Sequence, residues 1–552
     1  MKRFLLLIAV IALAATVAFA AGEQEGAATG DGVVQVTEPG TFPVLQEKIS
    51  VDVLLSRTAR VEDLESNDFT QWYEERTNVH LNMEQVPDQQ MEEKLNITLA
   101  SGDYPEVIIS RAIDKTEVML YGQQGVFQRL NDVIEEHSVH LRQLMEEEPY
   151  VRDGITTPDG NIFALPRTEE CYHCTAAQKM FVYQPWLDKL GLDMPTTTEE
   201  FRDMLVAFAE EDPNGNGLSD EIPLAGAAQG WHTYLHGFLM QPFEYSDGTT
   251  YLKLEDGDIS FAASTEGWRD GLRYLTDLYA DGLIAPESFT QDNAQHKQLG
   301  ENPDIPILGA APAGWYGVFT VNYSDSGRFL DYQAVPPLEG PDGTRRTARY
   351  NYSLHQQLVV TEKFDYPEVM VRWADWFYTL DGSISGHRGR EGVAWRRAEE
   401  GELSYTGEQG YYQMIEATQY GQMQNVNWQH TGLGHNSVFV RESMVSAQED
   451  PTIGQEYRLW KWTGELYEPY QIPPEDTLPD LFFTAEQARE IADLRTTIQD
   501  FVTSSVARFV SGAQDIDNDA EWQAYIRELE QMGVERYVEI YQEAYDINMG
   551  HM

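Results

Sequence analysis

The chain has 552 residues, a length that indicates more than one domain, and its 42% hydrophobic and 11% aromatic content argues against global disorder. Its formal net charge is −53, and a surface this acidic repels phosphate backbones and anionic lipids while it attracts cations. We therefore expect no nucleic-acid partner and no function at a membrane surface.

The N-terminal residues have the layout of a secretory signal. Lys2 and Arg3 are followed by an apolar stretch over residues 4–17, and Ala18-Phe19-Ala20 fits a cleavage site, so residues 1–20 are predicted to be a signal peptide. The apolar stretch is too short to span a bilayer comfortably, and a retained anchor is the alternative. No cysteine follows it for lipid attachment, so we expect a soluble, secreted or periplasmic protein. Residues 21–47 are rich in Gly, Glu, Thr and Ala and are predicted to be a disordered leader.

Strand-like and helix-like segments alternate after the leader. The apolar patterns predict strands and helices in the order β-α-β-α-β, at residues 48–55, 69–76, 79–83, 91–100 and 106–110. This order is typical of an open, mainly parallel sheet covered by helices, in which ligands bind beyond the carboxyl ends of the strands. Arg57 and Arg111 follow two of these strands and are candidate ligand contacts.

The middle and the end of the chain contain clear helix signals. Thr197 and Glu200 form a capping box before a helix at 198–210, and a second apolar stripe predicts a helix at 267–280. Thr484 with Gln487 opens a helical C-terminal region that continues through 522–532 and 534–545. Aromatic residues at helical spacing in this region are interpreted as core.

The loop that follows the helix at 198–210 has the pattern of a calcium site. Calcium binds six to eight oxygen atoms, and side-chain oxygens stand at every second position of this glycine-containing loop. The pattern departs from an EF-hand at its twelfth position, where Pro223 replaces the usual Glu, so we expect a static, structural Ca²⁺ rather than a sensor. The alternative is a polar turn without a metal. The expected ligands are Asp212, Asn214, Asn216, the carbonyl of Leu218, Asp220 and Glu221.

The only two cysteines are Cys171 and Cys174, separated by Tyr172 and His173. A zinc site needs about four ligands, and this sequence offers three. A thioredoxin-type site would start a helix after a strand, which is not the context here. A local disulfide in an oxidising compartment is therefore the preferred interpretation.

Four stretches carry a family resemblance, at residues 99–109, 121–131, 184–224 and 533–545, and Asp212-Pro-Asn-Gly-Asn-Gly217 is the most specific part. They resemble family 1 extracellular solute-binding proteins of ABC transporters, in the subgroup of alginate-oligosaccharide-binding and LipO-like proteins. The resemblance implies an α/β fold of the periplasmic-binding-protein-like type II, with two α/β lobes joined by a hinge. It also implies an oligosaccharide ligand, ABC permease subunits as partners, and a structural Ca²⁺ at the positions named above.

We expect lobe 1 to comprise residues 48–165 and about 305–365, and lobe 2 to comprise residues 166–304 and about 366–552. The protein is expected to act as a monomer. Many relatives of this kind are lipoproteins, and this chain lacks their acylated cysteine.

A sugar site combines aromatic platforms with planar polar groups. Aromatic residues beside glycine or polar residues, outside helical stripes, are the better candidates, and ordinary packing is the alternative for each one. Convergence of Arg57, Arg60, Arg111, Arg345, Arg346 and Arg349 would indicate a uronate. The candidate ligand residues are Arg57, Arg111, Trp231, His232, Trp315, Tyr316, Tyr350, Tyr352 and Trp428.

The expected function is capture of a carbohydrate for an ABC importer by hinge closure, without catalysis. A secreted glycoside hydrolase and a sugar-sensing module for a membrane receptor are the alternatives. The hydrolase would need a pair of carboxylates beside a cleft, and 91 acidic residues make such pairs uninformative. The sequence contains none of the GxSxG, HExxH or P-loop motifs.

Overall fold

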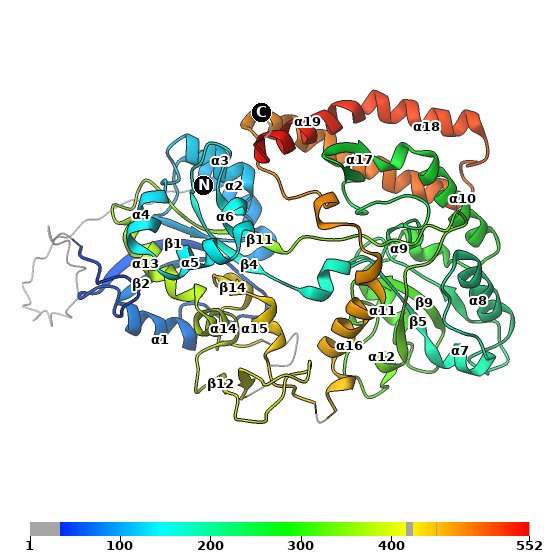
Figure 1. Cartoon of the computed structure of the whole chain (residues 1–552), viewed down its shortest axis with the longest axis horizontal. Coiled ribbons are helices and arrows are strands. Elements are labelled where there is room, and N and C mark those ends of the chain that lie inside the picture. The colour runs from blue at the N-terminus through cyan, green and yellow to red at the C-terminus, as the bar shows by residue number, and fades with distance from the viewer. Residues whose placement is uncertain (1–33, 416–422, 449, 551–552) are drawn as a thin grey trace, which may run out of the picture. The chain divides into compact units, whose positions relative to one another are not determined.

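The computed structural model describes residues 34–415, 423–448 and 450–550. Two mixed β-sheets, one of six strands and one of four, organise this part of the chain (Figure 1). We call the six-stranded sheet with the helices packed on it lobe 1, and the four-stranded sheet with its helices lobe 2. The predicted signal peptide lies outside the described residues.

The sheet of lobe 1 has the strand order β14-β4-β11-β3-β1-β2. Strand β1 pairs in parallel with β2 and β3, while β11 runs antiparallel between β3 and β4. Met91 and Leu95 of helix α2 pack with Leu54 and Ile108 from the strands, which buries this face of the sheet. The strands are β1 Ile49–Arg57, β2 Val79–Pro87, β3 Val107–Ile109, β4 Ala164–Glu169, β11 Ser353–Val360 and β14 Gly434–Asn436.

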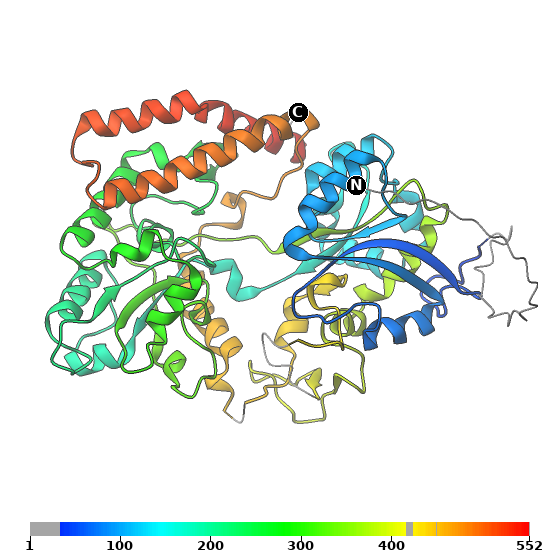
Figure 2. The same cartoon turned by 180° about the vertical axis from the view of Figure 1, so that it is seen from behind.

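The helices of lobe 1 lie in the first third of the chain and again after β11; Figure 2 shows the first two strands and their helices from behind. They are α1 Asp68–Thr77, α2 Asp88–Ser101, α3 Lys115–Gln123, α4 Asn131–His137, α5 His140–Glu147, α6 Pro149–Ile155, α13 Pro367–Asp375, α14 Leu380–Arg388 and α15 Val438–Glu442. A short ribbon formed by β12 Trp395–Arg397 and β13 Tyr412–Met414 lies between α14 and α15 in the chain.

The sheet of lobe 2 has the order β10-β5-β9-β6, with β5 antiparallel to both neighbours and β6 parallel to β9. Its strands are β5 Lys179–Tyr183, β6 Ile222–Leu224, β9 Leu308–Ala313 and β10 Tyr332–Val335, with a separate hairpin of β7 Leu252–Glu255 and β8 Asp258–Phe261. Its helices are α7 Gln184–Leu190, α8 Thr198–Glu210, α9 Leu235–Leu239, α10 Glu266–Ala280, α11 Asn293–Gly300, α12 Arg328–Asp331 and α16 Gln455–Trp462.

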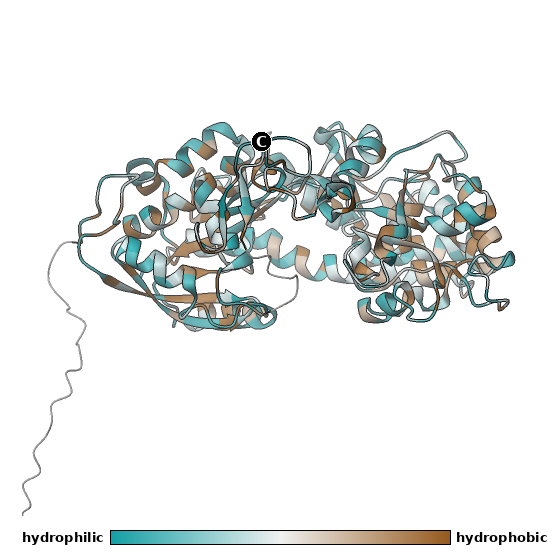
Figure 3. Cartoon of the chain, turned by 90° about the horizontal axis from the view of Figure 1, so that it is seen from below, coloured by the Kyte–Doolittle hydropathy of each residue, from teal (hydrophilic) through white to brown (hydrophobic). Residues whose placement is uncertain are grey.

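The last three helices, α17 Ala485–Val510, α18 Asp519–Met532 and α19 Val534–Asn548, belong to the core of lobe 2. Ile498, Val502 and Trp522 share one buried cluster with Trp268 of α10 and Phe181 of β5. Figure 3 shows hydrophobic and hydrophilic residues mixed along the helices of the chain, as expected for helices with one buried face. The interpretation of the C-terminal aromatic residues as core is therefore confirmed.

Over the described residues the chain passes between the lobes three times, and the first two passages matter for the site. The third leads from α15 of lobe 1 to α16 of lobe 2. The first crossing, residues 170–178, joins β4 of lobe 1 to β5 of lobe 2. The second crossing, residues 336–352, leads from β10 of lobe 2 back to β11 of lobe 1. A 3-10 turn at Tyr172–Ala176 occupies the middle of the first crossing.

Several predicted elements are confirmed, and two expectations need correction. The capping boxes of Thr197 with Glu200 and of Thr484 with Gln487 both form, and α8 covers the predicted residues. The predicted leader, in contrast, is not disordered throughout its length. Val44 and Leu45 are buried, and the Arg372 guanidinium donates hydrogen bonds to backbone carbonyls of residues 38 and 41. A long-range arginine contact of this kind leaves no pattern in the local composition.

The second correction concerns the division into lobes. Strands β9 and β10 fall within residues 305–365, which were expected in lobe 1, yet both pair within the sheet of lobe 2. Helices α13 to α15 and strand β14, expected in lobe 2, belong with the lobe 1 sheet, because β14 pairs with β4. The chain returns to lobe 1 at the second crossing, which the sequence pattern did not mark.

None of the helices formed by the described residues is long and apolar enough to cross a membrane.

Candidate functional site

A hollow of about 240 Å³ lies where the two crossings meet a loop of lobe 2. It is slightly smaller than the roughly 300 Å³ at which typical small-molecule pockets begin. The first crossing, the β6–α9 loop and the end of the second crossing all contribute to its wall. Its lining residues are Glu169, Cys171, Cys174, Ala177, Trp231, His232, Tyr350, Asn351, Tyr352 and Ser353.

Four of the nine predicted ligand residues meet at this hollow, namely Trp231, His232, Tyr350 and Tyr352, and we call them the aromatic side. Trp231 keeps 37% of its surface exposed, which is unusual for a tryptophan in a protein with large cores. Its ring lies over Gly314, where a Cβ atom would overlap it. The ring therefore has a fixed position and leaves part of its surface exposed, as a platform for a sugar requires.

His232 and Tyr350 connect the lobe 2 loop to the second crossing. The centroids of their rings are 4.9 Å apart, and the Tyr234 hydroxyl lies 2.9 Å from His232 Nδ1. The His232 backbone has φ 56°, a left-handed conformation uncommon for a non-glycine residue. Burial lowers the pKa of His232 to about 4, with a smaller contribution from the Lys179 charge. This ring is therefore neutral near pH 7 and can both donate and accept a hydrogen bond.

Tyr350 is held at its hydroxyl. The Gln178 amide donates to this oxygen at 2.8 Å, and the hydroxyl donates to the Asp247 carbonyl at 2.6 Å. Tyr352 packs near Tyr150 of α6, with ring centroids 6.3 Å apart. Because both tyrosines are anchored on other elements, their positions in the wall of the hollow are set before any ligand arrives.

Lobe 1 contributes the carboxylate of Glu169 to the wall of the hollow. We call Glu169 and its two partners, Arg167 and His430, the charged side. The Arg167 guanidinium donates to Glu169 Oε1 at 2.6 Å and to the Gly432 carbonyl at 2.6 Å, and it is 1% exposed. His430 Nδ1 lies 3.2 Å from the same carboxylate oxygen. Burial alone would raise the pKa of Glu169. The hydrogen bond from His430 and the charge of Arg167 together lower it by more than burial raises it, so the pKa lies well below its usual range. Glu169 is therefore an ionised acceptor at the wall of the hollow.

Of the two predicted arginines, Arg111 lies next to the charged side and Arg57 does not. Arg111 donates to His355 Nε2 at 2.9 Å, and His355 is on β11. Burial, together with the Arg111 charge, lowers the pKa of His355 to about 4, so this ring accepts the hydrogen bond in its neutral form. Arg57 donates instead to the carbonyls of Val61 and Glu62, in the loop after β1.

Three predicted aromatic residues lie away from the hollow. Tyr316 is fully buried among Phe181 and Trp462, and Trp428 is 1% exposed, with its Nε1 donating to Thr70 Oγ1 at 2.6 Å. Trp315 is half-buried and packs over Gly317. For Tyr316 and Trp428 the expectation of ligand contact is wrong, because neighbouring hydrophobic residues enclose both rings.

The six arginines that would indicate a uronate do not converge. Arg345, Arg346 and Arg349 donate to the backbone carbonyls of Thr196, Gln241 and Ile472, respectively. Their guanidinium groups hold segments of lobe 2 in place.

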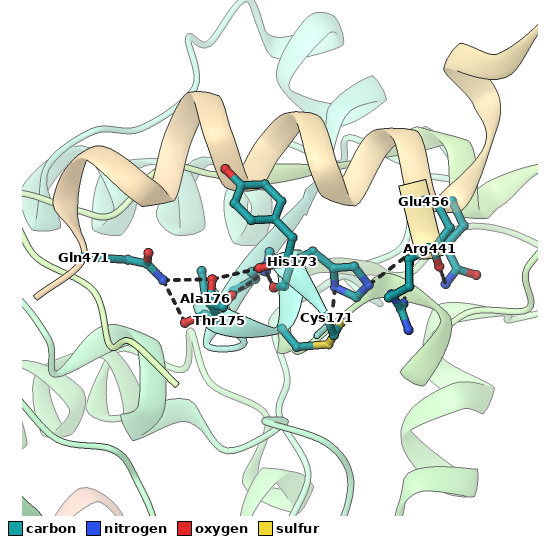
Figure 4. Close-up of a disulfide and its surroundings, with 11 residues drawn as sticks. Cys171, His173, Thr175, Ala176, Arg441, Glu456 and Gln471 are labelled. Carbon is teal, nitrogen blue, oxygen red and sulfur yellow. Dashed lines mark hydrogen bonds and ion pairs between the residues drawn. A yellow bond between two sulfur atoms is a disulfide. The ribbon is translucent and has the colours of Figure 1, made fainter. Parts of the chain in front are cut away.

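Cys171 and Cys174 form a disulfide, as the sequence suggested, and it lines the hollow (Figure 4). The turn around it is tied down by other contacts. The Lys179 ammonium donates to the carbonyls of His173 and Ala176, the first at 2.7 Å, and Gln471 Nε2 donates to the Thr175 carbonyl at 2.7 Å. Burial lowers the pKa of Lys179 to about 7, because no carboxylate compensates for the loss of water.

The predicted calcium loop curls around its own carboxylates. Asp212 accepts hydrogen bonds from the backbone nitrogens of residues 215, 216 and 217, at 2.9–3.1 Å. The Asn214 and Asn216 amides donate to Asp220 at 2.7–3.0 Å, and Glu221 lies 3.4 Å from the Asn214 nitrogen. Leu218 is 63% exposed at the tip. Most of the predicted ligand groups thus come together, and their oxygens suit a hard cation.

Glu169, Asn351 and Ser353 line the hollow but were not among the predicted residues. Glu169 ends strand β4, the kind of position that drew attention to Arg57 and Arg111. The stretch Arg167-Thr-Glu-Glu170 is polar in sequence, and nothing local shows that Arg167 is a buried partner for a carboxylate. The strand-end rule could have identified Glu169 if β4 had been recognised.

Known proteins with this fold are two-lobed binding proteins of the periplasmic-binding-protein-like type II. An extracellular solute-binding protein from Bifidobacterium longum subsp. infantis has a TM-score of 0.77 at 20% identity, covering 91% of this chain and 98% of that chain. An EF-hand mutant of the Streptococcus pneumoniae protein FusA, in complex with fructo-nystose, has a TM-score of 0.71 at 23% identity, covering 91% of this chain and 100% of that one.

The family follows from the sequence match. Residues 59–382 match the family described as bacterial extracellular solute-binding protein, and the chain belongs to this family. A curated relative, the fructooligosaccharide ABC transporter substrate-binding protein FusA of Streptococcus pneumoniae serotype 4, is 26% identical over 519 residues, covering 92% of this chain and 91% of FusA.

Proposed function

We propose that this chain captures an oligosaccharide in the hollow between the two crossings and delivers it, outside the cytoplasm, to the permease subunits of an ABC importer. The observation that carries the proposal is the pairing of a half-exposed tryptophan with an ionised carboxylate across one hollow. A sugar presents apolar C–H faces and hydroxyl groups, and these two walls complement both features.

The position of the hollow supports transport rather than storage. The first and second crossings form its wall, so a ligand held there contacts two of the three segments that any change between the lobes would bend. The bound sugar would favour the lobe arrangement with which it makes more contacts, and the permease subunits would recognise that arrangement. We propose that the protein acts as a monomer, since the hollow is complete within one chain.

The relatives support a carbohydrate rather than another solute. FusA is named for fructooligosaccharides, and its solved structure contains fructo-nystose. We therefore place fructooligosaccharides first among the ligands to test, with uronate oligomers as the contrast. The arginines that a uronate would need are engaged with backbone carbonyls.

The test is a calorimetric titration of the purified chain with oligosaccharides, combined with chromatography of the sugar afterwards. We expect saturable binding of one sugar per chain, with the sugar recovered intact. Shortened products would support a hydrolase instead. Binding by none of the neutral or uronate oligosaccharides would overturn the proposal.

We also propose that the loop at residues 212–221 holds a structural Ca²⁺. Support comes from the oxygen-rich loop itself and from the EF-hand named in the FusA mutant structure. When bound, the ion would neutralise the carboxylates of Asp212, Asp220 and Glu221 and hold the loop closed. Because the loop follows α8 and precedes β6, its effect would be on the stability of lobe 2.

A further inference from the structure

Three potential metal ligands lie together beside the hollow. Cys171, His173 and Cys174 place their sulfur atoms and a ring nitrogen within 4.8 Å of one another, and His173 Nδ1 is 3.9 Å from Cys174 Sγ. In a tetrahedral zinc site with Zn–S near 2.3 Å and Zn–N near 2.0 Å, sulfur and nitrogen ligands are about 3.5 Å apart. The distance between His173 Nδ1 and Cys174 Sγ is therefore already close to the one that a small thiophilic ion requires, and the two sulfurs, joined here in a disulfide, would separate on reduction.

The Glu456 carboxylate lies near Nε2 of His173, the ring nitrogen that faces away from the sulfur atoms. Metal-binding histidines commonly have a carboxylate at this position. His173 Nε2 is 3.8 Å from Glu456 Oε2, and Arg441 Nη2 is 3.3 Å from the same oxygen (Figure 4). Figure 4 shows the His173 ring between the sulfur atoms and Glu456. A carboxylate on the far ring nitrogen fixes the tautomer and leaves Nδ1 free to bind a metal. At 3.8 Å the Glu456 carboxylate lies just beyond hydrogen-bond distance, so it would act as a positioning residue by moving closer to Nε2 when the ion binds.

The fourth coordination position of such an ion would face the hollow. Both cysteines line the hollow, so an ion between them would reach its water. Sites with two cysteines and one histidine that keep an open position are an established zinc geometry. Three protein ligands, too few for a closed structural site, are enough for an open one.

We propose that, in its reduced state, the Cys171–Cys174 turn binds one thiophilic divalent ion such as Zn²⁺ through both sulfurs and His173 Nδ1, with the fourth position facing the hollow. The disulfide and the metal are then alternative states of the same turn. The hydrogen bonds from Lys179 and Gln471 to this turn do not involve sulfur, so they hold it in both states.

The exchange between the two states balances. An external dithiol supplies two electrons to the sulfur–sulfur bond, becomes a disulfide itself, and leaves Cys171 and Cys174 as thiols. On binding Zn²⁺ the two thiols release two protons to solvent, while His173 binds as the neutral ring with its proton on Nε2. Two thiolates and one divalent ion give a centre without net charge, which limits the cost of burial.

The test uses Co²⁺ as a spectroscopic substitute for Zn²⁺. The purified chain is reduced with a dithiol, desalted without oxygen, and titrated with Co²⁺. We expect sulfur-to-cobalt charge-transfer absorption that saturates at one ion per chain and disappears when Zn²⁺ is added. Co²⁺ bound at the oxygen-rich loop would not produce this absorption, so the two sites are distinguished. The oxidised chain and the C171S/C174S variant should remain silent.

Two further variants test the roles of the other residues. Glu456→Gln should retain the absorption but weaken Co²⁺ binding about tenfold or more, as loss of a carboxylate behind a histidine ligand does. His173→Ala should weaken binding further and change the visible absorption of the ion. Unchanged binding in His173→Ala, or no charge-transfer absorption in a reduced chain, would overturn the proposal. A reduced chain that lost its far-ultraviolet circular dichroism would also contradict it, because the turn must stay folded without the bond.

Discussion

The two walls of the hollow are built on opposite principles. On the aromatic side, Trp231 is more than a third exposed, and its indole packs against Gly314. On the charged side, the carboxylate of Glu169 is already bound by Arg167 and by His430. The Trp231 ring is therefore exposed to solvent before a ligand binds, whereas the Glu169 carboxylate is already paired within the protein.

This difference implies different roles in binding. Aromatic surface left in water contributes nothing to folding and is available to cover the face of a sugar. A buried ion pair is costly to assemble, but once assembled it presents an acceptor at a fixed position without reorganisation. Removing the Trp231 ring should therefore affect affinity alone, and changes on the charged side should affect both stability and affinity.

The largest expected effect is that of Glu169→Gln. The amide cannot compensate for the buried Arg167 charge, so we expect the free energy of unfolding to fall by about 2–3 kcal/mol and sugar affinity to fall about tenfold. Denaturant unfolding and calorimetric titration measure the two quantities. Glu402→Gln is the matched control, because Glu402 pairs with Arg396 at the surface and its loss should reduce stability much less. Equal costs for the two variants would show that the charged side is not a buried pair.

Trp231→Ala should have the next largest effect, and on affinity only. Removing the platform should weaken sugar binding about tenfold to a hundredfold, since buried tryptophan contacts dominate binding energies, while the melting temperature changes little. Tyr323→Ala removes another exposed aromatic ring, away from the hollow, and should leave affinity unchanged. A Trp231→Ala chain that binds sugar normally but melts early would reverse the assignment of the two walls.

Acidification should destabilise the chain through buried histidines on or near both walls. The pKa of His232 on the aromatic side and of His355 near the charged side is lowered to about 4 by burial, so both rings are neutral in the folded chain. The unfolded chain takes up these protons first, near pH 6.5, so their contribution to stability is lost as the pH falls from about 6.5 to 4. The contribution of Glu169 to stability is lost only as the pH falls below about 4.3, the pKa of Glu in the unfolded chain, so Glu169 does not contribute to the loss of stability between about pH 6.5 and 4.3.

Histidine ring chemical shifts in NMR spectra should therefore show both residues neutral at pH 5.5. In addition, His232→Gln should flatten the dependence of the melting temperature on pH between 7 and 5. A His232 that titrates near 6.5 in the folded chain would contradict the burial of this ring.

Removal of calcium should have the smallest effect on the hollow. The chelator EDTA should lower the melting temperature by a few degrees, and added Ca²⁺ should restore it, because the ion would compensate for clustered carboxylates. Sugar selectivity should stay the same, since the loop does not line the hollow. Asp220→Asn should abolish the response to both reagents; a chain indifferent to EDTA would contradict the calcium proposal.

The sequence predicted much of the fold because its signals were local. The capping box at Thr197 and Glu200 and the apolar stripe from Phe201 to Phe208 define α8 without reference to the rest of the chain. The lobe division was not predictable in the same way, since β9 and β10 join lobe 2 through pairings with β5, far away in sequence. Strand pairing over such separations leaves no local pattern.

The same contrast holds for the site. Trp231, His232, Tyr350 and Tyr352 could be identified because aromatic residues outside helical stripes lack an obvious packing role. Glu169 was missed because β4, the strand that it ends, was not recognised, and composition alone does not distinguish one carboxylate among 91 acidic residues. Tyr316 and Trp428 satisfied the aromatic rule and were nevertheless enclosed in the cores.

The central claim is that this hollow binds an oligosaccharide without altering it. The most direct measurement is a titration of the wild-type chain and of Trp231→Ala with a fructooligosaccharide, followed by chromatography of the sugar. The account predicts one intact sugar bound per wild-type chain and binding weakened at least about tenfold in the variant. Equal binding by the two chains, or release of shorter sugars by the wild type, would contradict it.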